Sequence, residues 1–173
     1  MPRPEDMVHP LSRELADTAK FTSTHAILVS ETETSLPWLV TGMVLMVQQA
    51  CVMALSEAGA ELPAMPGPGE LVARVADPAC LAQPFTAPLR AEDHRAIERV
   101  VAARNDVMHP RPRGLNLDAR PLPGGIVVCS RLVRHLAITQ PVRPSMVDGH
   151  DAAVLGDALS LIETSADFWA SVF

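Results

Sequence analysis

The chain has 173 residues, almost half of them apolar, and a formal charge of −6 at pH 7. This length suits one domain with a substantial core, and the apolar share excludes a globally disordered chain. The net acidic charge excludes a protein that simply coats nucleic acid. Aromatic residues are few, tyrosine is absent and Ala, Val, Leu and Met are plentiful, so we expect an all-α fold of packed helices.

Cysteine usage and the N-terminal composition bear on the cellular setting. Cys51, Cys80 and Cys129 are odd in number and widely spaced, with no CxxC pair. A reduced, cytoplasmic setting fits this pattern better than a disulfide framework, and the pattern does not support zinc or thiolate chemistry. The opening residues 1–6 also lack the apolar core of a signal peptide.

Three prolines in residues 1–10 predict a flexible N-terminal arm, followed by a single helical domain over residues 11–173. Ser12 is the expected cap of a first helix that runs from Arg13 to about Ser30. His25 lies near the apolar side of this helix, and we expect it to be a core group rather than a ligand.

A second helix is predicted to begin at Thr34 or Ser35 and to end near Ala58, with Gly59 as its C-cap. It is apolar on nearly every face, which predicts the central helix of the core. Its three methionines, Met43, Met46 and Met53, are expected in core packing or in a dimer contact.

The apolar run Leu36–Leu55 is also long enough to span a membrane. Gln48 and Gln49 interrupt it, acidic residues flank it and no Lys or Arg anchors either end. We therefore expect a buried helix and no membrane partner. Gln48 and Gln49 are also the local polar candidates on this helix to face a site, with no role assigned to either.

Residues 63–69 form a turn-rich connection, residues 70–76 a predicted short helix and residues 77–88 an irregular stretch with three prolines. A third long helix begins near Glu92 and ends in the sequence Arg104-Asn105-Asp106-Val107-Met108-His109-Pro110. At about 100° per residue, Arg104 falls within an apolar stripe, where a guanidinium is costly unless it is paired or faces a site. Pro110 disfavours helical geometry at His109, so His109 should end the helix.

Downstream of His109 the chain is rich in Pro, Gly and Arg as far as Gly125, and Arg111, Arg113 and Arg120 lie in this loop. Residues 124–138 contain a short run that is compatible with a strand, but the spacing of the later apolar residues favours a helix. A last helix begins at Asp148 or Asp151, and its expected core stripe comprises Val154, Leu155, Ala158, Leu161, Ile162 and Phe168. The predicted architecture is an up-down bundle of four to five main helices.

Basic residues are concentrated around the end of the third helix. Between Arg90 and Arg143 there are ten arginines and five acidic residues, whereas the rest of the chain is strongly acidic. A local basic patch on an acidic protein suits a ligand that carries phosphate, although solvated helix faces would give the same pattern.

An arginine, a polar residue, three further residues and a histidine at a helix end resemble the signature of the HEPN superfamily, here Arg104, Asn105 and His109. The resemblance covers roughly residues 11–173, with the motif itself confined to Arg104–His109. It implies an all-α, usually dimeric domain. Many members are metal-independent ribonucleases, some of them toxins. Some toxin-type members have a tyrosine two positions after the histidine, where this chain has Arg111.

The resemblance therefore implies a metal-independent endoribonuclease, a toxin or defence component, with a composite site at a homodimer interface. Arg104 would hold phosphate oxygens, His109 would transfer a proton and Asn105 would orient His109 or the ribose. Arg111 and Arg113 would contact the RNA backbone. No cofactor or metal ligand set is expected, and an antitoxin protein is a possible partner.

Three alternatives to this enzyme remain open at the level of sequence. The chain could be a non-catalytic HEPN module that binds a nucleotide, RNA or a protein partner. It could instead be a structural helical subunit. In a purely structural reading, Arg104 pairs with a carboxylate or with helix-end carbonyl groups, and His109 only caps the helix.

Overall fold

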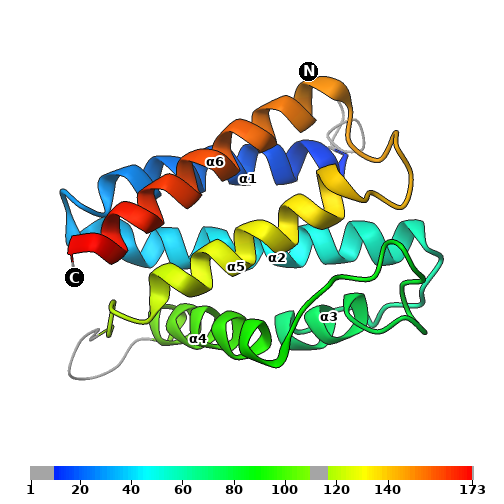
Figure 1. Cartoon of the computed structure of the whole chain (residues 1–173), viewed down its shortest axis with the longest axis horizontal. Helices are drawn as coiled ribbons and strands as arrows, with labels where there is room; N and C mark the ends of the chain where they lie inside the picture. The colour runs from blue at the N-terminus through cyan, green and yellow to red at the C-terminus, as the bar shows by residue number, and fades with distance from the viewer. Residues whose placement is uncertain (1–9, 110–116, 173) are drawn as a thin grey trace, which may run out of the picture.

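The computed structural model describes residues 10–109 and 117–172 and confirms the all-α fold class. Five long helices alternate in direction, as predicted for an up-down bundle, and one short helix is inserted between the second and third of them (Figure 1). Residues 1–9 of the predicted N-terminal arm, and Arg111 and Arg113, lie outside the described residues. The helices are α1 (Leu11–Leu28), α2 (Leu36–Glu57), α3 (Pro68–Val75), α4 (Ala91–Met108), α5 (Leu122–Arg134) and α6 (Gly149–Val172).

The helices form three levels in Figure 1, with α1 and α6 along the top, α2 and α5 through the middle and α3 and α4 below. The guanidinium Nε of Arg13 lies 3.3 Å from Oδ1 of Asp151, which pairs the first turns of α1 and α6. A short 3₁₀ turn, η2 (Glu33–Ser35), leads into α2, and a π-helical turn, η3 (His135–Thr139), extends α5.

Helix α2 is the centre of the core, because apolar residues occupy nearly all of its faces. Met43, Met46 and Met53 are buried, which confirms their predicted role in packing. Gly42 allows α1 to approach closely, since a Cβ at this position would lie 2.2 Å from the Thr22 hydroxyl oxygen. Within the described residues, α2 is the one helix that is long and apolar enough to cross a membrane, and it is mostly buried against the other helices.

Helix boundaries follow local chemistry at α2 and α4. Gly59 adopts φ +76° directly after α2, as its predicted C-cap role requires. At the start of α4 the Asp93 carboxylate accepts the backbone N–H of Arg90 at 2.9 Å, so this acid closes the first turn. His109 has extended backbone angles (φ −112°, ψ 98°), and the predicted end of the helix at this residue is therefore confirmed.

Three details of the sequence interpretation are wrong. Ser12 does not cap α1, because the helix already includes it and begins at Leu11 after Pro10. Leu161 and Phe168 are exposed, and Trp169 is buried in place of Phe168. The buried face of α6 differs from the predicted stripe because α1 and α5 both pack on this helix. These two neighbours, and not the pattern of apolar residues alone, determine which side chains of α6 are buried.

Candidate functional site

The C-terminal turns of α4 carry the three motif residues, and Arg104 lies at the edge of the packed face. The buried residues of α4 are Ala96, Ile97, Val100 and Ala103, so Arg104 is beside the core rather than in the middle of an apolar stripe. Its side chain is half-buried. Within the described part of the chain, no carboxylate lies within ion-pair distance of its guanidinium, and it makes no side-chain hydrogen bond. The structural alternative, in which Arg104 pairs with a carboxylate, therefore has no support among the described residues.

His109 is exposed at the end of α4, where the chain leaves the helix. Its backbone N–H donates to the carbonyl of Asn105 at 3.1 Å, which completes the last turn. The extended backbone at His109 takes this residue out of the helical repeat that places Arg104.

Asn105 lies on a different face of α4 from Arg104. Its side chain lines an open hollow of about 220 Å³ between α3 and α4, together with Gly69, Val72, His94, Ile97, Glu98, Val101 and Ala102. Neither Arg104 nor His109 lines this hollow. The side chain of Asn105 therefore points to a different side of α4 from that of Arg104, because adjacent helical residues point about 100° apart.

Two further sequence candidates lie on α2. Gln48 and Gln49 are both half-buried, and the Oε1 atom of Gln49 is buried without a hydrogen-bond partner among the described residues. Among the described residues, no hydrogen bond joins either glutamine to Arg104 or His109. Their roles therefore stay unassigned.

Arg120, one of the loop arginines after the motif, is engaged with Asp118. Its Nε donates to Oδ1 of Asp118 at 2.9 Å and its Nη2 donates to Oδ2 at 3.0 Å. These bonds to the Arg120 side chain hold the pKa of the Asp118 carboxyl below its usual value. Both side chains are well exposed, so the pair is a local surface contact that a phosphate could replace.

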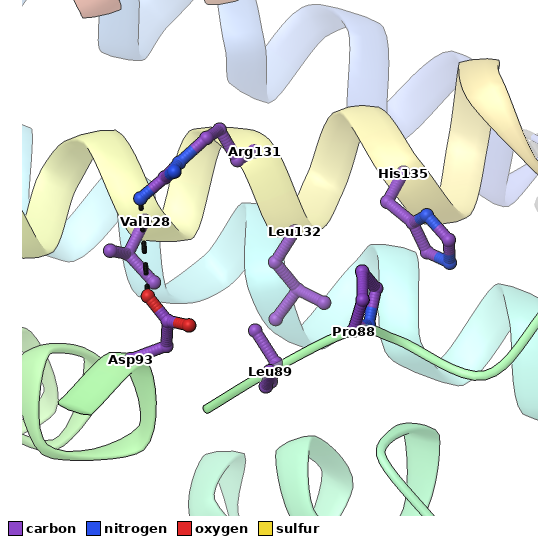
Figure 2. Close-up of a pocket in the computed structure, with 7 residues that line it drawn as sticks. All are labelled: Pro88, Leu89, Asp93, Val128, Arg131, Leu132 and His135. Atoms are coloured by element: carbon purple, nitrogen blue, oxygen red, sulfur yellow. Dashed lines mark ion pairs between the residues drawn. The ribbon is translucent and has the colours of Figure 1, made fainter. Parts of the chain in front are cut away.

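A second hollow of about 120 Å³ lies between α5 and the segment that leads into α4 (Figure 2). One wall consists of Val128, Arg131 and Leu132 from α5 and His135 from η3, and the facing wall consists of Pro88, Leu89 and Asp93. In Figure 2 the Arg131 side chain extends towards Asp93 at one end, the His135 ring lies at the other end and aliphatic side chains fill the middle. The sequence analysis missed this hollow, because its two walls are about 40 residues apart in the chain and only α4–α5 packing brings them together.

Other reactive groups in the described chain are buried or dispersed. Burial raises the pKa of the Cys129 thiol to about 12 and also raises that of Cys51, which makes both poor nucleophiles. Within residues 10–109 and 117–172, no three His, Cys, Asp or Glu side chains are arranged to hold a metal ion.

Comparisons of the chain with protein-family models, with curated proteins and with solved structures give no match. The fold itself defines the class of protein, which is an all-α up-down bundle of five long helices with a short inserted helix. A function for the protein has to be inferred from the chemistry and placement of its own residues, above all Arg104 and His109 at the end of α4.

Proposed function

We propose that the protein is a metal-independent endoribonuclease of HEPN type, with its site at the C-terminal end of α4. The observation that carries the proposal is Arg104, a half-buried residue near the end of α4 whose guanidinium has no acidic partner among the described residues. Its hydrogen-bond donors are therefore available to a ligand with negative charge. The planar fork of arginine matches two phosphate oxygens.

His109 supplies the acid–base group of the proposed reaction. The attack of a ribose 2′-oxygen on the adjacent phosphorus needs a base to take the 2′-OH proton, and the departing 5′-oxygen needs a proton from an acid. The products are a 2′,3′-cyclic phosphate and a free 5′-hydroxyl. His109 suits either role, because an imidazole ring can both accept and donate a proton, and Arg104 offsets the charge that develops on the phosphate.

A second copy of the chain would complete this site. One copy offers a single histidine at the end of α4, whereas the reaction needs both a base and an acid. Met108, directly before His109, is an exposed large apolar residue, as expected at a surface that another copy covers. In a two-fold dimer, one His109 would act as base and the other as acid, next to two Arg104 side chains.

The second candidate function is a non-catalytic module that binds a phosphate-bearing ligand. The position of Asn105 favours it, since this side chain lines the hollow between α3 and α4, which Arg104 does not line, so the motif residues do not all face one site. Phosphate binding at Arg104 needs no such arrangement. Cleavage distinguishes the two candidates.

The test is the incubation of purified full-length protein with a structured RNA such as tRNA, in the presence of EDTA. The proposal expects cleavage by the wild type, loss of cleavage in His109→Ala and retained cleavage in His150→Ala. His150 is an exposed histidine at the start of α6, away from the end of α4, and therefore controls for the loss of any histidine. Equal cleavage by wild type and His109→Ala, or no cleavage by either, would leave the binding module as the better explanation.

A further inference from the structure

The hollow between α5 and the segment before α4 contains two opposite charges that only partly satisfy each other. The Nη2 atom of Arg131 lies 3.9 Å from Oδ1 of Asp93, which is too long for a hydrogen bond. The other carboxylate oxygen of Asp93 is already used, because it accepts the Arg90 backbone N–H. Donors on Arg131 and an acceptor on Asp93 are therefore available side by side at the edge of the hollow.

The rest of the hollow is aliphatic and small. Figure 2 shows Leu132, Leu89 and Pro88 between the charged pair and His135, with Val128 beneath the Arg131 side chain. The Nε2 atom of His135 lies 3.0 Å from the Phe85 carbonyl oxygen. This hydrogen bond holds the imidazole ring at the end of the hollow opposite the charged pair. The volume is about 120 Å³, and an engineered apolar cavity of about 150 Å³ holds benzene. The space therefore fits a short branched hydrocarbon group.

These features restrict the charge of a ligand. A ligand with only a negative charge would be attracted by Arg131 but repelled by Asp93. A ligand with only a positive charge would be attracted by Asp93 but repelled by Arg131. A ligand with a positive and a negative group close together can form an ion pair with each of the two residues. An α-amino acid has this arrangement, whereas a peptide separates its free ammonium and carboxylate groups.

We propose that this hollow binds a small branched aliphatic α-amino acid. Its carboxylate accepts from the Arg131 guanidinium, its ammonium donates to Oδ1 of Asp93 and its side chain contacts Leu132, Leu89 and Pro88. Arg131 is well exposed and the Asp93 side chain retains 20% of its exposure, so the charged end of the hollow is open to entry from solvent. The proposal is independent of the ribonuclease function and involves no covalent step.

Three probes of nearly the same shape test the proposal on the full chain. L-valine carries both charges, isobutylamine is the same molecule without the carboxylate, and isovalerate lacks the ammonium group. Binding is followed by backbone amide NMR shifts up to about 10 mM ligand, a range that detects millimolar affinity. We expect L-valine to shift residues around Leu89 and Leu132 and to bind about tenfold more tightly than either single-charge probe, since each charged hydrogen bond contributes that much or more.

Two variants and one control locate the site. Arg131→Met and Asp93→Asn should each weaken L-valine binding about tenfold, and Asp93→Asn keeps an oxygen for the Arg90 N–H. Arg95→Met removes an exposed arginine of α4 that does not line the hollow, and its affinity should equal that of the wild type. The proposal is overturned if L-valine causes no shifts, if it shifts another region, if isobutylamine or isovalerate binds equally well, or if both variants bind like the wild type.

Discussion

Gly125 on α5 lies directly against the backbone of Ala96 on α4. A Cβ at Gly125 would be 2.7 Å from the Ala96 carbonyl oxygen and 2.6 Å from a methyl carbon of Val100. Glycine thus lets the two helices approach to backbone contact. This contact joins α4, which carries the motif residues, to α5, which lines the hollow shown in Figure 2.

Gly125→Ala should destabilise the protein by about 1–3 kcal/mol, because the new methyl group would clash with the backbone carbonyl oxygen of Ala96, which cannot move by a side-chain rotation. The measurement is the free energy of unfolding in urea. Gly124→Ala is the matched control, since a Cβ at that position meets nothing within 4 Å. The control should be neutral or more stable by up to about 1 kcal/mol, as expected for alanine in a helix. Equal losses in both variants would contradict the close contact.

Asp148 stabilises the start of α6 in a pH-dependent manner. Its Oδ1 accepts the backbone N–H of Asp151 at 2.8 Å, and this bond, with smaller effects from His150 and Arg13, holds the pKa of Asp148 below its usual value. A carboxyl with a lowered pKa in the folded state stabilises the protein above its unfolded pKa, and this contribution is lost as the pH falls through the folded pKa.

Asp148→Ala should therefore be less stable than the wild type at neutral pH, and the difference should shrink as the pH falls below about 4. Unfolding in urea at several pH values measures this. Asp157→Ala, an exposed acid of α6 without an ion pair or side-chain hydrogen bond among the described residues, should show a smaller effect at neutral pH. A constant difference between Asp148→Ala and the wild type over the whole pH range would contradict the interpretation.

Arg104 should be dispensable for folding and essential for RNA cleavage. It has no ion-pair partner among the described residues, so Arg104→Met should change the free energy of unfolding by less than about 1 kcal/mol. Cleavage should nevertheless fall by a factor of about 100 or more, and Arg104→Lys should not restore it, because an ammonium group lacks the two-pronged geometry. Thermal and urea unfolding next to the cleavage assay separate the two effects. A large stability loss in Arg104→Met would instead support a structural role.

Asn105 should contribute little to cleavage. It lines the hollow between α3 and α4, which neither Arg104 nor His109 lines, so Asn105→Ala should reduce the cleavage rate by no more than about tenfold, whereas a proton-transfer group contributes about 10²–10⁴-fold. Single-turnover rates for Asn105→Ala and His109→Ala provide the comparison. Comparable losses would indicate that Asn105 does position the histidine, as the sequence pattern predicts.

The dimer can be tested at Met108. This residue is 55% exposed next to His109, and Met108→Asp should place a charge in the proposed interface, shift the protein from dimer to monomer and abolish cleavage. Met65→Asp, at a 93% exposed methionine in the connection before α3, should leave the dimer intact. Sedimentation equilibrium measures both. A wild-type protein that is monomeric at micromolar concentration would remove the composite site.

Local sequence signals determined the helices and their ends. The apolar faces predicted α2 as the central helix, Gly59 supplied the left-handed residue after it, and Pro110 removed His109 from helical geometry. Each of these features depends on residues within one or two turns of one another. For that reason the fold class, the alternation of five long helices and the helical state of α5 could be predicted without a structure.

Tertiary packing decided which side chains share a surface. The sequence grouped Asn105 with Arg104 and His109, but α3 packs beside α4 to form a hollow that Asn105 lines and that Arg104 and His109 do not line. Likewise, no local pattern brings Arg131 next to Asp93, and these residues lie together because α5 packs against α4. The relative rotation and spacing of two helices depend on contacts between residues far apart in the chain, and helical periodicity carries no information about them.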